Sequence, residues 1–248
     1  LPPGDATPER LLELAYETNP ALGTRIAERT VLNEARTMSA DGFARERLGW
    51  WRPGGTQEPP LIDPDRWDEC RVADGDAMQE GVKAFGVKFS PDGRTAALSV
   101  ALAQRGGPSY VELIEVSGTS RGTDGLAARS ATTAALAIDG KSGTAPLVKR
   151  LLDRGYPGRA LVECSAANAQ ASVAMLLDEV NAGTVSHIAS PALDESATRS
   201  IKRKIGSNGG FGFGDGPGSI SCPVESAALA LWAARTTRRD PKRKQRAW

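Results

Sequence analysis

The sequence predicts an α/β protein in which helices flank a mixed β-sheet, preceded by a helical segment and a linker. Two observations predict this class: three β-compatible segments joined by short turns, and a later alternation of apolar strands with amphipathic helices. The chain of 248 residues is long enough for one sizeable core. No apolar run approaches the roughly 18 residues of a membrane-spanning helix, so we expect no membrane partner.

The beginning of the chain has the spacing of helices. Residues 8–22 and the longer run 24–51 place apolar side chains such as Val31 and Ala35 one turn apart. The segment from residue 52 to 62 is rich in Pro and Gly and cannot continue a helix. We therefore expect a helical segment over 1–51.

A linker over 52–80 and a sheet domain over 81–248 complete the expected organisation. Within that domain, residues 82–90 and 95–104 are apolar and β-compatible, and the Ser-Pro-Asp-Gly between them is a turn sequence. They predict a hairpin, and the alternating segment 109–118 predicts a third strand.

Strands and helices then alternate along the chain. A strand over 131–139 is followed by a helix over 144–153, a strand over 159–164 and a helix over 166–181. Antiparallel strands followed by this alternation predict a mixed sheet. The rest is read as a helix near 193–204, a Gly-rich loop or hairpin over 207–219, and a final helix over 223–235.

Composition excludes several classes of protein. Apolar residues make up 40% and charged residues 25% of the chain, which is ordinary for a globular protein. Cys70, Cys164 and Cys222 are far apart and outside any CxxC pair, so neither a disulfide framework nor a zinc site is indicated. The first residues lack the pattern of a signal peptide, so we expect an intracellular protein. The missing initial Met suggests a fragment of a longer chain.

Gly140-Lys141-Ser142 invites a phosphate-binding interpretation, because backbone amides and a Lys before a helix bind phosphate well. The phosphate-loop motif also requires an earlier Gly, and that position is Ala135. We therefore set nucleotide binding aside.

Two carboxylates are the main site candidates. Asp139 ends an apolar strand, where it can either bind a hard cation or cap the following helix. Glu225 lies in the first turn of the last helix, where the helix dipole stabilises it or where it faces the same sheet edge as Asp139. Converging carboxylates can hold paired Mg²⁺ or Mn²⁺ ions for attack on phosphodiesters.

Three further side chains are weaker candidates. Asp92 sits in a turn that favours Asp for backbone reasons, and Glu163 ends a strand without an identified partner. His187, the only histidine, has no nucleophile motif to serve, which favours a hydrogen-bonded structural role. The basic stretch that begins at Arg235 is either a solvated tail or an electrostatic arm for nucleic acid.

The order of these segments resembles the C-terminal half of the large terminase subunit of tailed bacteriophages, from an actinobacterial phage or prophage. The matching pieces, which span nearly the whole chain, are NPALGTRI, FARERLGWW, LIDPDRW, AFGVKFSPDGRTAALSVAL, AIDGKSGTAPLVKRL and a Gly-rich loop running into PVESAALALWAA. The resemblance implies an RNase H-like nuclease domain, preceded by a helical segment from the ATPase or linker region. It also implies double-stranded DNA, the portal or procapsid and the terminase small subunit as partners, in the cytoplasm of the bacterial host.

The resemblance implies three acidic positions, of which this chain matches one. Asp139 matches the second position, and the first, usually Asp in a Gly-Val-Asp context, is Lys88 here. The third is commonly an Asp just before or within the last helix, where Glu225 is the nearest match, and Asp92 is a possible replacement ligand. Lys88 either contacts the scissile phosphate or occupies the space of one metal ion.

The leading hypothesis is a DNA endonuclease domain of a viral packaging motor that uses two Mg²⁺ or Mn²⁺ ions, with Asp139, Glu225 and Asp92 as catalytic metal ligands. Backbone contacts to DNA would come from basic residues without sequence reading; these are Lys88, Lys202, Arg203, Lys204 and Arg243. The alternative is a catalytically weak or inactive RNase H-like module that clamps DNA or docks the motor on the portal.

Overall fold

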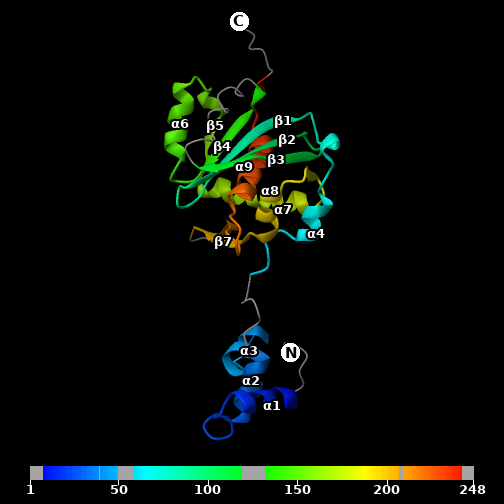
Figure 1. The fold of residues 1–248 in the computed structure, drawn as a ribbon, viewed down its shortest axis with the longest axis vertical. Helices are drawn as coiled ribbons and strands as arrows, with labels where there is room; N and C mark the ends of the chain where they lie inside the picture. Colours follow the sequence, from blue (N-terminus) through cyan, green and yellow to red (C-terminus); the bar gives the residue numbers. More distant parts are fainter. Residues whose placement is uncertain (1–7, 39, 50–57, 119–131, 207–208, 242–248) are drawn as a thin grey trace. The chain divides into compact units, whose positions relative to one another are not determined.

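A six-stranded mixed β-sheet forms the centre of the larger part of the protein, as the sequence predicts (Figure 1). The computed structural model describes residues 8–38, 40–49, 58–118, 132–206 and 209–241. The chain divides into two units, Leu1–Glu58 and Pro59–Trp248. Within the described ranges, no helix is long and apolar enough to span a membrane.

The first unit consists of short helices, as expected for this part of the chain. They are α1 (Pro8–Thr18), α2 (Glu28–Thr37) and α3 (Ala40–Arg47). Val31 and Phe43 are buried at its centre. The unit therefore has a small apolar core of its own.

The second unit begins earlier in the chain than the predicted linker over 52–80 allows. Residues 59–80 contain α4 (Pro64–Glu69) and the short 3₁₀ helix η2 (Asp74–Asp76). The side chain of Asp63 caps α4 by accepting from the Asp65 amide at 2.9 Å. Trp67 on α4 is buried in the core of the second unit, so this stretch is part of the folded unit rather than a linker.

The sheet has the strand order β5-β4-β1-β2-β3-β6. The strands are β1 (Val82–Phe89), β2 (Thr95–Ala103), β3 (Ser109–Gly118), β4 (Ala135–Asp139), β5 (Leu161–Glu163) and β6 (Val185–His187). β2 pairs antiparallel with β1 and β3, whereas β4 pairs parallel with β1 and β5, and β6 pairs parallel with β3. This arrangement confirms the predicted mixed sheet and adds β6, which was not predicted.

The helices that follow the first three strands agree with the sequence except around residue 200. They are α6 (Thr144–Asp153), α7 (Ala166–Asn181), α8 (Pro191–Arg199) and α9 (Cys222–Thr236). The predicted helix near 193–204 is wrong beyond Arg199, because Ile201–Ile205 forms strand β7. β7 pairs antiparallel with β8 (Gly210–Gly214), and its Ile-Lys-Arg-Lys-Ile sequence alternates with the period of a strand.

The two faces of the sheet carry separate cores, which the alternation of strand side chains creates. Phe85 and Val87 on β1 belong to the core that α6 covers. Ala84, on the opposite face of β1, belongs to the core that contains α7, α8 and α9. Figure 1 shows α9 lying between the sheet and these two helices.

Small residues bring α9 unusually close to the sheet. A Cβ atom on Gly86 of β1 would lie 2.1 Å from the Ser226 carbonyl oxygen of α9, so only glycine fits there. Ser99 on β2 and Ser226 on α9 also meet through their hydroxyl oxygens at 2.6 Å. This contact fixes the first turn of α9 against the middle of β1 and thereby sets the position of Glu225.

Candidate active-site crevice

The ends of β1 and β4 carry the charged side chains at the centre of the candidate site. Alternation puts Lys88 on the same face of β1 as Gly86, and Asp139 on the same face of β4 as Ala137. Parallel pairing sets Lys88 directly beside Asp139. Both side chains therefore point to the face that α9 covers.

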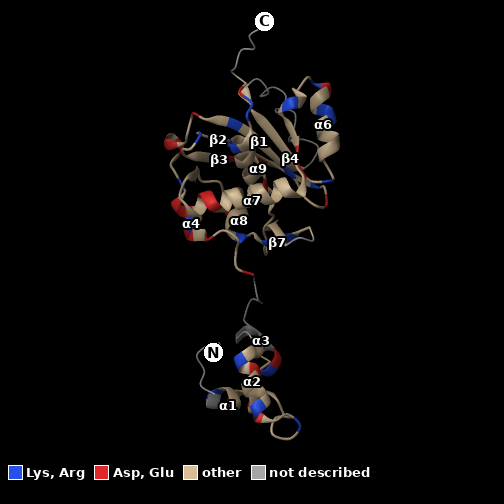
Figure 2. Ribbon diagram, turned by 180° about the vertical axis from the view of Figure 1, so that it is seen from behind, with Lys and Arg blue, Asp and Glu red and all other residues tan. Residues whose placement is uncertain are grey.

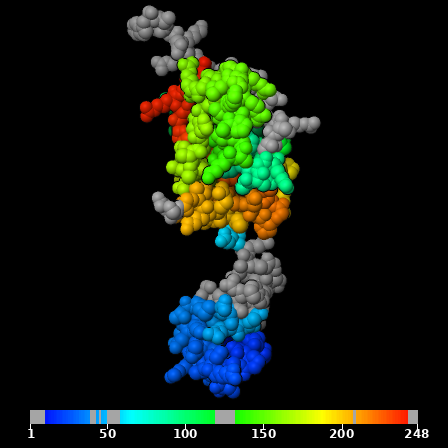
Figure 3. Space-filling view, turned by 90° about the vertical axis from the view of Figure 1, so that its left-hand side faces the viewer, coloured from blue at the N-terminus to red at the C-terminus, as the bar shows by residue number. Residues whose placement is uncertain are grey.

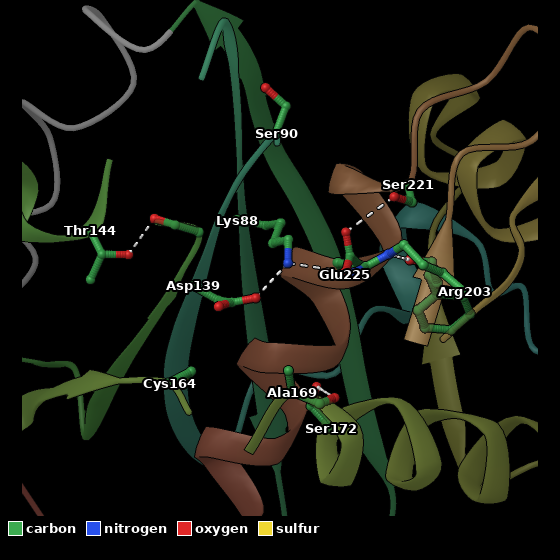
Figure 4. A network of polar contacts seen from close by, with 12 residues as sticks. Lys88, Ser90, Asp139, Thr144, Cys164, Ala169, Ser172, Arg203, Ser221 and Glu225 are labelled. Carbon is green, nitrogen blue, oxygen red and sulfur yellow. Dashed lines mark hydrogen bonds and ion pairs between the residues drawn. The ribbon is translucent and has the colours of Figure 1, made fainter. Parts of the chain in front are cut away.

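Glu225, from the first turn of α9, meets the same ammonium group. Lys88 Nζ contacts Asp139 Oδ2 and lies 3.1 Å from Glu225 Oε1, as Figure 4 shows. The Lys88, Asp139 and Glu225 side chains are 9%, 21% and 8% exposed. The structure thus brings together two of the predicted acidic residues, although they lie far apart in the sequence.

Hairpin β7–β8 and the turn before α9 complete the cluster. Arg203 on β7 donates from Nη2 to Glu225 Oε1 at 2.9 Å. The Ser221 hydroxyl lies 3.1 Å from Glu225 Oε2, and both the amide and the hydroxyl of Ser221 lie within 2.9 Å of Asp215 Oδ1. Three carboxylates and two cationic side chains therefore share this crevice.

Burial and charge act in opposite directions on these groups. Burial would lower the pKa of Lys88, but the carboxylates of Glu225 and Asp139 outweigh it, so its pKa lies above the usual value. Burial raises the pKa of Glu225, even though Lys88 and Arg203 favour its charged form. Lys88 is therefore a charged ammonium group held by its carboxylate neighbours.

A cavity of about 470 Å³ opens beside these side chains. Its lining includes Lys88, Asp139, Arg203, Asp215 and Glu225. Figure 3 shows the α6 segment (green) and the segments around residues 200–214 (amber to orange) on one face of the second unit. The crevice is large enough for a substrate group to reach the carboxylates.

Asp215 is a potential functional residue that the sequence analysis missed. It follows β8, lines the cavity and is exposed. The available signal was its place in the Gly-rich segment just before the last helix, where the terminase resemblance implies an acidic residue.

Asp92 is engaged within its own turn, contrary to the expectation that it joins Asp139 and Glu225. It accepts hydrogen bonds from the Ser90 hydroxyl at 2.5 Å and the Arg94 amide at 3.0 Å, and its side chain is 58% exposed. Asp92 is not among the described residues that line the cavity. The turn uses this carboxylate locally, as the backbone interpretation of the sequence predicts.

The predicted DNA-contacting residues fall into different environments. Lys88 is buried and engaged with two carboxylates, and Arg203 points into the crevice. Lys202 and Lys204 are exposed on β7, and the Lys202 ammonium lies 4.6 Å from the centre of the Phe211 ring. Figure 2 colours Lys and Arg positions blue along the ribbon. Arg243 lies outside the described residues.

His187 and Glu163 do not belong to the crevice. His187 is buried, stacks on Trp67 with ring centroids 4.0 Å apart, and places Nε2 2.9 Å from the Trp67 carbonyl oxygen. This environment agrees with the predicted structural role. Glu163 pairs in register with Ile138, on the sheet face opposite to that of Asp139.

The resemblance implies a divalent metal, and the donors of the crevice fit this expectation only in part. No group of three or more His, Cys, Asp and Glu side chains suited to a metal occurs in the described part of the chain. The two-ion set that was expected from Asp139, Glu225 and Asp92 therefore does not fit this arrangement. Within the same ranges, no donor contacts Asp139 Oδ1 or Asp215 Oδ2, so each of these cavity-lining carboxylates retains one oxygen for a single ion.

Comparison with known proteins identifies the fold. No protein-family model and no curated protein sequence matches the chain. The structure is similar to the large terminase of bacteriophage HK97, with a TM-score of 0.55 and 17% sequence identity, over 94% of this chain and 56% of that one. The chain thus spans little more than half the length of that terminase.

Two nuclease structures from the thermophilic phage G20c are also similar. The G20c large terminase nuclease matches over 67% of this chain and 95% of its own length, with a TM-score of 0.48 and 13% identity. Its structure with bound magnesium matches over 69% and 97%, with a TM-score of 0.48 and 14% identity. The predicted RNase H-like fold class is confirmed, because this chain has a six-stranded mixed sheet flanked by helices and its fold is similar to that of the HK97 large terminase.

Proposed function

We propose that this chain contains the nuclease domain of a phage DNA-packaging terminase large subunit and cuts DNA with the help of a divalent metal ion. The observation that carries the proposal is the convergence of Asp139, Asp215 and Glu225 on one cavity of an RNase H-like fold. Carboxylates from β4, the segment after β8 and α9 meet there although they are remote in sequence. Ionisable groups that cluster in a cavity are typical of active sites.

Asp139 and Asp215 are the proposed metal ligands, because each has a carboxylate oxygen that can face an ion in the cavity. Carboxylate oxygens are hard ligands, which favours Mg²⁺ or Mn²⁺ over softer metals. Such an ion, when bound, activates water and stabilises charge on phosphodiester oxygens. Glu225 would act as a positioning residue through Lys88 and Arg203 rather than as a direct ligand.

DNA would be held mainly through its phosphates. Exposed Lys202 and Lys204 on β7 lie on the hairpin whose Arg203 reaches the crevice. Basic side chains in the C-terminal tail, including Arg243, would add contacts to the backbone. Because phosphate contacts carry no sequence information, cutting by the isolated chain should show little sequence preference.

The partners of the full motor are part of the same proposal. We propose that residues 1–51 derive from the ATPase or linker region of a longer subunit of an actinobacterial tailed phage or prophage. In that motor the chain would work with the portal or procapsid and the terminase small subunit, in the cytoplasm of the bacterial host. The likeness to the HK97 large terminase over 94% of this chain supports the placement.

A plasmid assay tests the nuclease proposal. The chain is incubated with supercoiled plasmid and Mn²⁺, beside Asp139→Ala and the control Asp153→Ala, which alters a 61% exposed carboxylate on α6. We expect nicking by the wild type and by Asp153→Ala, and its loss in Asp139→Ala. Equal nicking by all three proteins would show that the crevice is not the site.

A second candidate function is a DNA clamp or portal-docking module without cutting activity. The buried Lys88 ammonium, bound by two carboxylates, favours it because these groups neutralise one another without a metal ion. Filter binding of the same plasmid distinguishes the two functions. Equal DNA retention by wild type and Asp139→Ala, with no nicking by either protein, would support the clamp.

A further inference from the structure

The space between Asp139 and Glu225 already contains a positive charge. We propose that Lys88 is a permanent internal cation of the crevice and excludes a divalent ion from the space between these two carboxylates. The proposal rests on the proposed function only in taking the crevice as the site of metal uptake. The ammonium group of Lys88 thus occupies the position where a metal ion would otherwise bind.

Strand pairing on both sides holds Lys88 in place. Its backbone pairs with Ala97 of β2 on one side and with Asp139 of β4 on the other. The residue is 7% exposed. Because the neighbouring strands anchor its backbone, no loop movement can withdraw Lys88 from the crevice.

The ammonium also satisfies a carboxylate that is otherwise buried. Glu225 has a side-chain exposure of 8%, and Lys88 Nζ lies 3.1 Å from its Oε1 atom. A buried carboxylate needs a cation or hydrogen-bond donors to stay charged. Lys88, Arg203 and the Ser221 hydroxyl fill this role for Glu225.

A metal ion entering between the carboxylates would meet strong repulsion. It would have to approach the Lys88 ammonium within contact distance of the same oxygens, in a poorly hydrated site where charges interact strongly. It would also break the Lys88 contacts with both Asp139 and Glu225. Any ion that the crevice takes up must therefore lie on the cavity side, at Asp139 and Asp215.

Removing the ammonium should therefore create a new ion site. Mn²⁺ bound per chain is counted by electron paramagnetic resonance for the wild type, Lys88→Ala and Lys149→Ala. Lys149→Ala is the matched control, because it removes the same charge from a side chain that is 77% exposed on α6. We expect Lys88→Ala to bind one more Mn²⁺ per chain than either of the other two proteins.

The double variant Lys88→Ala/Asp139→Asn tests where the added ion binds. The gain should disappear in it, and Mn²⁺ should raise the melting temperature of Lys88→Ala more than that of the wild type, since an ion bound only to the native state stabilises it. A folded Lys88→Ala with the wild-type ion count would overturn the proposal. A gain that persists without Asp139 would overturn it as well.

Glu225→Gln gives a second test if Lys88→Ala does not fold. This variant retains the Lys88 ammonium, and we expect Mn²⁺ uptake equal to that of the wild type. Loss of an ion in Glu225→Gln would mean that a metal bridges the two carboxylates past Lys88, against the proposal. These counts do not depend on DNA cutting, so a chain that never nicks plasmid contradicts the proposed function while leaving this inference intact.

Discussion

The two ends of α9 carry clusters of charged side chains that differ in character. At its first turn lies the acid-rich end, defined by Asp139, Asp215 and Glu225, with Lys88 and Arg203 as their cationic neighbours. At its last turn lies the arginine end, defined by Arg235 and Glu179. One helix thus joins two ionic clusters at opposite ends of the sheet.

The arginine end is a balanced structural pair. Arg235 binds both carboxylate oxygens of Glu179, at 2.8 and 2.9 Å, and donates to the Gly107 carbonyl oxygen at 2.9 Å. The Ser109 hydroxyl also donates to Glu179. Two-point binding of this kind is strong and directional, and a cation is favoured at a helix C-terminus.

Cavity size alone does not distinguish the two ends. A cavity of about 480 Å³ lies at the arginine end and one of about 470 Å³ at the acid-rich end. Among the described residues, no carboxylate lines the first, whereas Asp139, Asp215 and Glu225 line the second. The comparison teaches that the two ends differ in the carboxylates that line them rather than in the size of the cavity, and the proposed active site lies at the end with the carboxylates.

The largest expected effect is on nuclease activity, which a substitution at the acid-rich end should lower and a substitution at the arginine end should not. Asp215→Asn should lower Mn²⁺-dependent plasmid nicking about a thousandfold, because losing one metal ligand removes about 4 kcal/mol of charge stabilisation. The matched change at the arginine end, Glu179→Gln, should leave nicking unchanged at a temperature where the protein is folded. Equal activity of Asp215→Asn and wild type would remove Asp215 from the site.

The second largest expected effect is on stability, where a change at the arginine end should cost more than a change at the acid-rich end. Arg235→Met leaves the Glu179 carboxylate, only 14% exposed, without its cation. We expect the free energy of unfolding to fall by about 3 kcal/mol, the cost typical of breaking a buried ion pair. Urea denaturation monitored by Trp fluorescence measures it, and Asp215→Asn, which alters an exposed residue, should cost far less. A loss below that of Asp215→Asn would show that the arginine end is not a structural pair.

The sequence predicts five of the six strands of the sheet and misses β6, and it succeeds where the signals are local. The Ser-Pro-Asp-Gly turn identifies the hairpin, and the periods of α6 and α7 give both helices with the observed bounds. It fails at β7 because the predicted helix extends from residues 193–199 into Ile201–Ile205, whose alternation over five residues is too short to mark a helix end by itself. Pairing with β8, which no local signal reports, decides that segment.

The acid-rich end could be predicted only in part. Asp139 is identified by its place at the end of an apolar strand. Its proximity to Glu225 depends on Gly86, because only glycine at this position lets α9 pack so closely against the sheet. Such close packing is a tertiary property that spacing does not encode. The pairing of Lys88 with Asp139 requires the register of β1 against β4, which also lies beyond local sequence patterns.

Cys222 provides a smaller, pH-dependent test at the acid-rich end. Burial, together with the nearby charge of Glu225, raises the pKa of this thiol to about 12 from its usual 9.0. The unfolded chain loses this proton first, so above about pH 9 the native state binds more protons and the free energy of unfolding falls as pH rises.

The loss assigned to Cys222 should be about 1 kcal/mol between about pH 9 and 10. Urea denaturation of wild type and Cys222→Ala at both pH values measures it, because the variant lacks this proton while sharing the other titrations. If the free energy of unfolding falls equally in the two proteins, the Cys222 thiol ionises in the native state as it does in the unfolded chain. Burial would then not raise its pKa.

The smallest expected effect is on DNA binding by basic residues beside the two ends of α9. Lys204 is exposed on the hairpin beside the acid-rich end, and Arg105 is exposed beside the arginine end. If DNA lies across the crevice, each phosphate contact adds about 0.9 to the slope of log binding constant against log salt. Lys204→Ala should therefore lower that slope by about 0.9, whereas Arg105→Ala should leave it unchanged, both measured by fluorescence anisotropy with a labelled duplex. Equal decreases of the slope in both variants would mean that DNA spans the two ends of α9. A decrease only in Arg105→Ala would mean that DNA binds at the arginine end.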